Sequence, residues 1–142
     1  MATFNKFEAF ITALAAGTHA GALNADTDVL KVYLSNATPS ASLDSVKADL
    51  AEITAENGYT AGGDDTQNAA TTTSGVITVV GTDVTITASG GTVGPFQYVV
   101  LYNDTATNDP LIGWWAHTEA VTLQDTESFT VDFGASMFTV GS

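Results

Sequence analysis

The stretch GPFQYVVLYND, from Gly94 to Asp104, limits most strongly what this chain can fold into. Successive side chains of an extended strand point to opposite faces of a sheet. Both faces would be apolar here, since one would carry Phe96, Tyr98, Val100 and Tyr102 and the other would carry Val99 and Leu101. A strand of this kind has to be covered on both sides. We therefore expect it at the centre of a β-sandwich, or of a sheet with a helix across its back.

Further strands are predicted at residues 29–35, 76–80, 83–88, 111–116, 121–124 and 128–133. Apolar and polar residues alternate in several of them, which is typical of antiparallel strands with one face in water. Residues 103–109 would form a hairpin loop, and Pro110 is tolerated because it stands at the first position of the next strand. The β core is thus predicted to span residues 75–142 together with the strand at 29–35.

An α-helix is predicted for residues 1–17, with Thr3 as its N-cap and Gly17 at its end. It would press an apolar stripe against the β domain, because large apolar residues recur at helical spacing. The stripe consists of Phe4, Phe7, Ile11 and Leu14. A secretory signal peptide is the less favoured alternative, since Glu8 interrupts the charge pattern that such a peptide needs.

Two other segments have weaker patterns. Residues 42–55 place apolar side chains three and four positions apart, which favours a short helix. Residues 58–74 are mostly Gly, Ala, Asp, Asn and Thr, so we expect a long exposed loop or arm with little to bury. A chain of 142 residues has the size of one domain. The predicted fold class is mainly β (α+β), an antiparallel β-sandwich-like domain with an N-terminal α-helix.

The charge balance excludes several kinds of partner. Lys6, Lys31 and Lys47 are the only strong cations, and the formal net charge is -13. Nucleic-acid binding needs cations that displace counterions from phosphates, so we expect no nucleic acid as a partner. Anionic membranes are disfavoured for the same reason, and no run approaches the ~20 apolar residues of a membrane span. The chain has no Cys, so disulfides and thiolate metal sites are excluded.

No catalytic motif is present in the sequence. His19 and His117 are the only histidines, and there is no Gly-x-Ser-x-Gly elbow, Walker loop or His-Glu-x-x-His helix. We therefore predict that the protein is not an enzyme and has no cofactor.

Two clusters of oxygen ligands raise the question of calcium. Asn24-x-Asp26-x-Asp28 matches the opening of an EF-hand loop, but Val29 stands where that loop requires Gly. Residues 103–104 and 108–109 repeat Asn-Asp, yet such residues also bond their own backbone in hairpin loops. The sequence predicts no bound metal.

Aromatic residues are the best candidates for recognition of a partner. Trp114 and Trp115 are adjacent in a predicted strand, so one ring should lie in the core and the other on the opposite face. Three interpretations stay open: both rings buried in the monomer, one ring in a protein interface, or a stacking platform for a small ligand such as a sugar. Together with Phe4, Phe7 and Tyr59, they are the candidate protein-interface residues.

Several blocks of the sequence resemble a family of small virion proteins of tailed bacteriophages, which includes capsid decoration, or cement, proteins. The blocks are FNKFEAF at 4–10, LKVYLSNATP at 30–39, AEITAENGYTAGG at 51–63, GPFQYVVLYND with DPLIGWW, and ESFTVDF. They cover nearly the whole chain in order, and residues 57–63 and 94–115 are the most distinctive. The link at 17–28 is longer than the family pattern, which bears on how the protein attaches.

The resemblance implies a non-enzymatic decoration protein that binds the outer surface of the phage major capsid protein lattice and stabilises the head. Such a protein would be made in the cytoplasm of the host bacterium and would act as a homotrimer on the virion. Strong acidity fits the outer surface, because a protein inside the head would meet packaged DNA. Residues 58–74 and the N-terminal region would reach the lattice. Two alternatives stay open: another virion component, such as a tail or neck protein, and a carbohydrate-binding adhesion domain.

Overall fold

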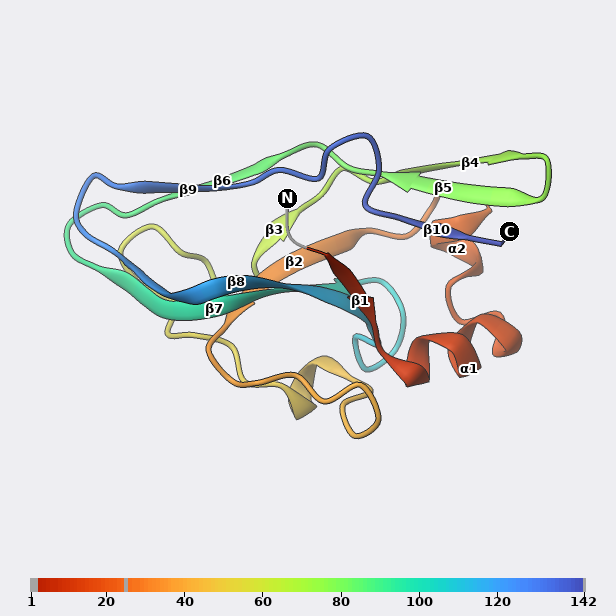
Figure 1. Ribbon diagram of the computed structural model, residues 1–142, viewed down its shortest axis with the longest axis horizontal. Coiled ribbons are helices and arrows are strands. Elements are labelled where there is room, and N and C mark those ends of the chain that lie inside the picture. The colour runs from red at the N-terminus through yellow and green to blue at the C-terminus, as the bar shows by residue number, and fades with distance from the viewer. Residues whose placement is uncertain (1–2, 25, 142) are drawn as a thin grey trace.

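The computed structural model describes residues 3–24 and 26–141 and shows an antiparallel β-sandwich with two short helices (Figure 1). One layer is a five-stranded sheet in the order β1-β8-β7-β2-β3. Its strands are β1 (Phe4–Lys6), β2 (Leu30–Ser35), β3 (Asp64–Asp65), β7 (Val93–Asn103) and β8 (Leu111–Leu123). The predicted mainly β fold class is confirmed.

The second layer is divided into two smaller sheets that follow one another across the same face of the large sheet (Figure 1). One has the order β10-β5-β4 and the other pairs β6 with β9. The strands are β4 (Ala69–Thr73), β5 (Val76–Val80), β6 (Val84–Thr87), β9 (Ser128–Val131) and β10 (Phe138–Val140). As the alternation predicted, Val84 and Ile86 of β6 are buried while its threonines are exposed.

β7 is the central strand, as its two apolar faces predicted. It pairs with β2 along one edge and with β8 along the other. Val99 and Leu101 belong to the main core between the layers, whereas Val100 belongs to a second core on the opposite face. Phe96 departs from the expected face and lies in the main core. The β7–β8 register shifts after Phe96, and this irregularity interrupts the simple alternation.

The second core lies on the outer face of the large sheet, beneath the irregular segment that follows β2 (Figure 1). The predicted helix at 42–55 is wrong, because this region holds only the 3₁₀ turn η1 (Lys47–Asp49). Leu50 is buried against the sheet, while Leu43 is 80% exposed. The segment is therefore irregular instead of helical. The Asp49 carboxylate fixes its turn by accepting hydrogen bonds from the backbone N–H groups of Ser45 and Val46.

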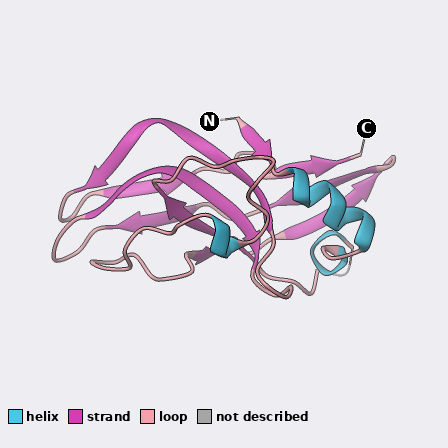
Figure 2. Cartoon of the chain, turned by 90° about the horizontal axis from the view of Figure 1, so that it is seen from below, coloured by secondary structure: helices cyan, strands magenta, loops and turns pink. Residues whose placement is uncertain are grey.

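The N-terminal helix is shorter than predicted. Residues 4–6 form β1, which pairs with β8, and the helix α1 (Glu8–Ala16) starts after it without a side-chain cap from Thr3. Gly17 ends α1 with a φ of 78°, as expected of a glycine C-cap. Phe10 is fully buried, whereas Ile11 is 56% exposed, so the predicted stripe is only partly right. A second helix, α2 (Ala20–Leu23), follows, and Figure 2 shows both helices at one end of the molecule.

The prediction of a long exposed loop at 58–74 is partly right, because most of these residues are exposed, but the segment is not a free loop. Tyr59 and Thr66 are buried, at 3% and 0% exposure, and β3 and β4 lie within the segment. β4 itself is mostly exposed and is held by pairing with β5. Ser74 and Gly75 both have positive φ, 53° and 80°, which suits the tight turn between two antiparallel strands. A composition with few apolar residues suggested a loop, but strands that are held by backbone pairing need little apolar surface.

Candidate functional site

Three of the five candidate interface residues lie inside the chain. Phe7, Tyr59 and Trp115 are only 0%, 3% and 5% exposed, respectively. Packing within the fold accounts for these rings, so they leave almost no side-chain surface for a partner. Phe4 and Trp114 are partly buried. An interface role stays a prediction for these two residues.

Trp114 and Trp115 face opposite sides of the large sheet, as predicted. The Trp114 ring packs on Phe7 at 4.6 Å between centroids and belongs to the outer-face core. The Trp115 ring packs on Phe4 at 4.8 Å and on Phe133 at 5.5 Å in the main core. Each indole is therefore supported by other rings on at least one side, which is not the arrangement of an open stacking platform for sugars.

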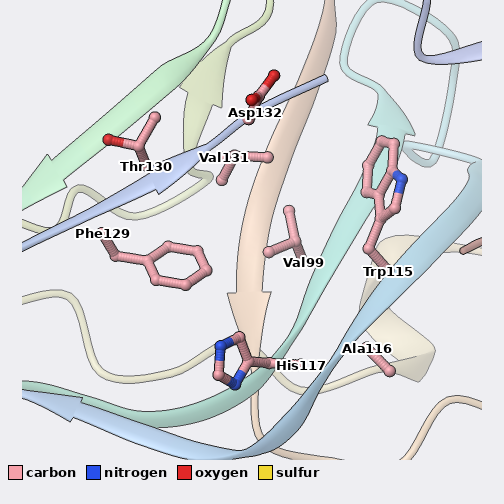
Figure 3. Close-up of a pocket in the computed structure, with 8 residues that line it drawn as sticks. All are labelled: Val99, Trp115, Ala116, His117, Phe129, Thr130, Val131 and Asp132. Carbon is pink, nitrogen blue, oxygen red and sulfur yellow. The ribbon is translucent and has the colours of Figure 1, made fainter. Parts of the chain in front are cut away.

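A hollow of about 250 Å³ opens between the two layers, where β8 lies across from β9 (Figure 3). Phe129 and Val131 point from β9 into this space, toward Val99 and Trp115 of the large sheet (Figure 3). Val99, Trp115 and Val131 are buried, whereas Phe129 is partly exposed. The lining is completed by Ala116, His117, Thr130 and Asp132. The floor is thus apolar, and polar groups lie at its rim.

Two strand edges border the hollow. Within residues 3–24 and 26–141, β9 pairs with β6 only, and the pairing of β8 with β1 ends at Trp115. Strand edges of this kind leave backbone N–H and C=O groups available to another chain. We call the hollow and these two edges the edge groove.

A bulge of several residues in β8 shapes one wall of the edge groove. Phe96 pairs with Val121 and Tyr98 with Ala116, so Gln97 alone stands opposite residues 117–120. The sequence predicted two strands here, at 111–116 and 121–124, and the structure joins them through this bulge. Gln97 Nε2 donates a hydrogen bond to the His117 carbonyl at 3.1 Å. The His117 ring meets Phe129 edge-on, with 6.0 Å between centroids. The bulge therefore directs His117 to the groove.

Comparison with known proteins adds no identity. No protein-family model, curated protein or solved structure matches this chain. Among the helices in the described ranges, none is both long and apolar enough to cross a membrane.

The surroundings of the edge groove are acidic. Asp132 lines its rim, and Glu119 lies exposed in the β8 bulge. The three lysines are engaged in contacts with other groups: Lys6 donates to the Thr139 carbonyl, Lys31 pairs with Asp104, and Lys47 pairs with Glu52. No Lys or Arg follows Lys47 in the sequence. A cationic partner would therefore be attracted to this face.

The oxygen clusters considered for calcium are occupied by protein donors. Asp26 accepts the Ala70 N–H at 2.9 Å, and Asp28 accepts the side-chain amide of Asn103 at 2.9 Å. Asn103 Oδ1 accepts two backbone N–H groups of the hairpin loop, which is the Asx role considered from sequence. Across the described residues, no three His, Asp or Glu side chains are grouped as metal ligands.

Glu52 organises a polar cluster within the segment between β2 and β3. It accepts hydrogen bonds from the Tyr59 hydroxyl at 2.6 Å, the Gly62 N–H at 2.8 Å and Lys47 Nζ at 2.9 Å. Burial, together with the bond to Glu52, raises the pKa of Tyr59 well above its ordinary value. The cluster uses charged groups to attach irregular backbone to the sheet, and we assign it a structural role.

His19 is fully buried, although it lies in the link at 17–28, which has few large apolar residues. Its Nδ1 lies 3.2 Å from the Asn103 side-chain amide, and its Nε2 has no hydrogen-bond partner among the described residues. Burial lowers the pKa of His19, and the nearby Asp28 carboxylate opposes this shift in part. A neutral imidazole is therefore favoured in the folded protein.

Sequence reasoning did not single out Phe129, His117 and Asp132, which lie around the edge groove. The one available signal was the alternation in the strand predicted at 128–133, which puts Phe129 and Val131 on one face. The open edges of β8 and β9 follow from the order of the strands in each sheet, which local patterns do not specify.

Proposed function

We propose that this chain is a non-enzymatic structural protein of a tailed-bacteriophage virion that binds the outer surface of the major capsid lattice as a decoration protein. The observation that carries the proposal is the edge groove, an apolar hollow bordered by two unpaired strand edges. Backbone edges together with apolar pockets recognise extended polypeptide, and they provide little for a small polar substrate. The sequence blocks that resemble phage virion proteins supply the biological setting.

The charge distribution supports a position outside the head. The formal net charge is -13, and the lysines present are paired with carboxylates or bonded to backbone. A protein on the inner surface would face packaged DNA, which repels such a charge. An acidic protein on the outer surface meets no such repulsion and helps to keep particles apart in solution.

Lattice binding explains how a chain without a catalytic motif could serve the virion. A protein that binds only the assembled lattice stabilises it by mass action, and a trimer that contacts several capsid subunits adds avidity. We therefore propose homotrimers that join neighbouring subunits of the major capsid protein.

The experiment is a cryo-electron microscopy reconstruction of the purified particle, combined with quantitative mass spectrometry. A decoration protein should give density outside the head and a copy number comparable with that of the major capsid protein. Density confined to the tail or neck, with few copies, would support the other virion role. Absence of the chain from the particle would contradict both.

The carbohydrate-binding alternative has a separate test. A glycan that stacks on Trp114, the more exposed indole, should quench its fluorescence in a Trp115→Phe variant. No response across a glycan panel, together with head density for the chain, would remove this alternative.

A further inference from the structure

We infer that the edge groove binds an extended segment of a partner protein in which apolar side chains alternate with Lys or Arg. This inference rests on the proposed function, because it names the chemistry of the segment that the partner would supply. It concerns one surface of the isolated chain, so it can be tested without the virion.

The shape of the groove favours a strand over a helix as the occupant. The hollow lies between the edges of β8 and β9, and its apolar floor is formed by Val99, Trp115 and Val131 (Figure 3). A strand added to either edge would form main-chain hydrogen bonds and would point every second side chain toward this floor. The partly exposed Phe129 ring provides the apolar contact nearest to solvent.

The charges at the rim select the other side chains of the segment. Asp132 and Glu119 are both exposed, and the chain has no Lys or Arg after Lys47. In an alternating segment, the residues that point away from the floor lie beside the rim and its carboxylates. Cations at these positions complement the acidic face, whereas carboxylates there would be repelled.

The same charges make a second copy of this chain a poor occupant. With a formal net charge of -13, one copy would bring more carboxylates to an already acidic face. The strands with exposed edges also carry few cations, since the lysines lie at Lys6, Lys31 and Lys47. A cationic segment of a different protein fits the groove better than self-association does.

The binding experiment uses the full chain and a synthetic peptide in which Lys alternates with Val or Leu. A Trp114→Phe variant leaves Trp115, which lines the groove, as the only indole reporter. We expect a saturable change in Trp115 fluorescence and slower amide exchange in β8 and β9. Binding should weaken as salt rises, because the complementary charges are exposed. Two control peptides, one with Glu in place of Lys and one with Pro at alternate positions, should not bind.

Variants of the chain test where the peptide binds. Phe129→Ala should weaken binding about tenfold, the size of effect expected for an aromatic anchor. The double change Glu119→Gln and Asp132→Asn should weaken it roughly fourfold, as expected for two exposed charge pairs. The amide introduced by Asp132→Asn keeps an oxygen that can accept the Gly134 N–H, so this second variant preserves a local contact. Glu8→Gln, on α1 at the other end of the molecule, is the control for loss of a carboxylate outside the groove and should bind as the parent does.

The outcomes separate the inference from the proposed function. Equal binding of the Lys and Glu peptides would overturn the inference, as would no binding at all, or binding unchanged in both groove variants. Dimers that form without peptide and disappear in Phe129→Ala would also overturn it in favour of a second copy. Peptide binding with no chain in the virion would leave the groove assignment intact and remove the virion proposal. Virion density with no peptide binding would support the virion proposal and overturn the groove assignment.

Discussion

The Asn103 side-chain amide donates a hydrogen bond to a carboxylate oxygen of Asp28 over 2.9 Å, and so joins the end of β7 to the link that precedes β2. The same amide nitrogen lies 3.2 Å from His19 Nδ1, while Asn103 Oδ1 accepts two backbone N–H groups of the hairpin loop. Asn103 is 0% exposed. One buried side chain thus connects the helical region to the central hairpin.

Replacement of Asn103 by Ala should destabilise the protein by about 2–4 kcal/mol, because it leaves His19 and two loop N–H groups without their partner. Denaturant unfolding monitored by circular dichroism measures the change. Asn36→Ala, at an exposed position, is the matched control and should change the unfolding free energy by less than about 0.5 kcal/mol. A loss for Asn103→Ala no larger than that of the control would contradict the network.

The free energy of unfolding should fall as the pH drops below about 6.5, the ordinary pKa of the His19 side chain in the unfolded chain. Burial lowers the pKa of His19 in the folded state, so the unfolded chain takes up the proton first. The loss should begin near pH 6.5, the ordinary pKa, and continue down to the folded pKa, with a slope of at most about 1.4 kcal/mol per pH unit. Unfolding curves between about pH 7.5 and 5 measure it, above the range in which most carboxylates titrate.

Two histidine variants identify the group responsible. His19→Leu should flatten the dependence in this window, and His117→Gln, at an exposed position of β8, is the control variant. An unchanged slope in His19→Leu would assign the effect to another group.

Removal of the Tyr59 hydroxyl should destabilise the segment between β2 and β3. This hydroxyl donates to Glu52 at 2.6 Å and accepts the buried Leu34 N–H at 3.0 Å. Tyr59→Phe leaves the buried Leu34 N–H without a partner and removes one of the three hydrogen bonds to Glu52, and we expect a loss of about 2–3 kcal/mol in unfolding free energy. Tyr98→Phe is the control, because that hydroxyl has only a 3.4 Å contact with Thr38 near the surface. Similar losses in the two variants would show that the Glu52 cluster does not hold this segment.

Glycine substitutions test whether residues 58–63 are fixed to the sheets. Gly63 has a φ of 78°, and an added Cβ would collide with the Val32 backbone. Gly75 has a similar φ of 80°, but an added Cβ there meets no atom within 4 Å. Gly63→Ala should therefore cost about 3 kcal/mol or more, and Gly75→Ala about 1 kcal/mol. Thermal melts of the two variants compare them, and equal losses would indicate that residues 58–63 are as free as the sequence suggested.

The strands were the most predictable part of this fold. β5 has the predicted bounds, β2 and β9 lie within predicted segments, and the two apolar faces of β7 correctly indicated its central place. These signals are local, since they depend only on which side of a strand each residue faces. Phe96 was misplaced because a bulge depends on the partner strand, which alternation does not show.

The irregular and marginal elements were harder to predict, because they depend on contacts with distant parts of the chain. Residues 42–55 have helical spacing, but Leu50 packs on the outer face of the large sheet while Leu43 is exposed, so no helical stripe is buried. β4 has almost nothing to bury and exists through pairing with β5. The edge groove depends on strand order and on the β8 bulge, so it could not be located from sequence, although Phe129 was correctly placed on its strand face.

The turn at Ser74–Gly75 offers a place to attach cargo. Residues 71–75 are exposed, and an added Cβ at Gly75 meets no atom within 4 Å. The hairpin of β4 and β5 carries this turn to one extremity of the molecule (Figure 1). A fluorophore or an epitope inserted there would leave the main core and the edge groove untouched. The hairpin could thus serve as a handle for displaying foreign peptides from this scaffold.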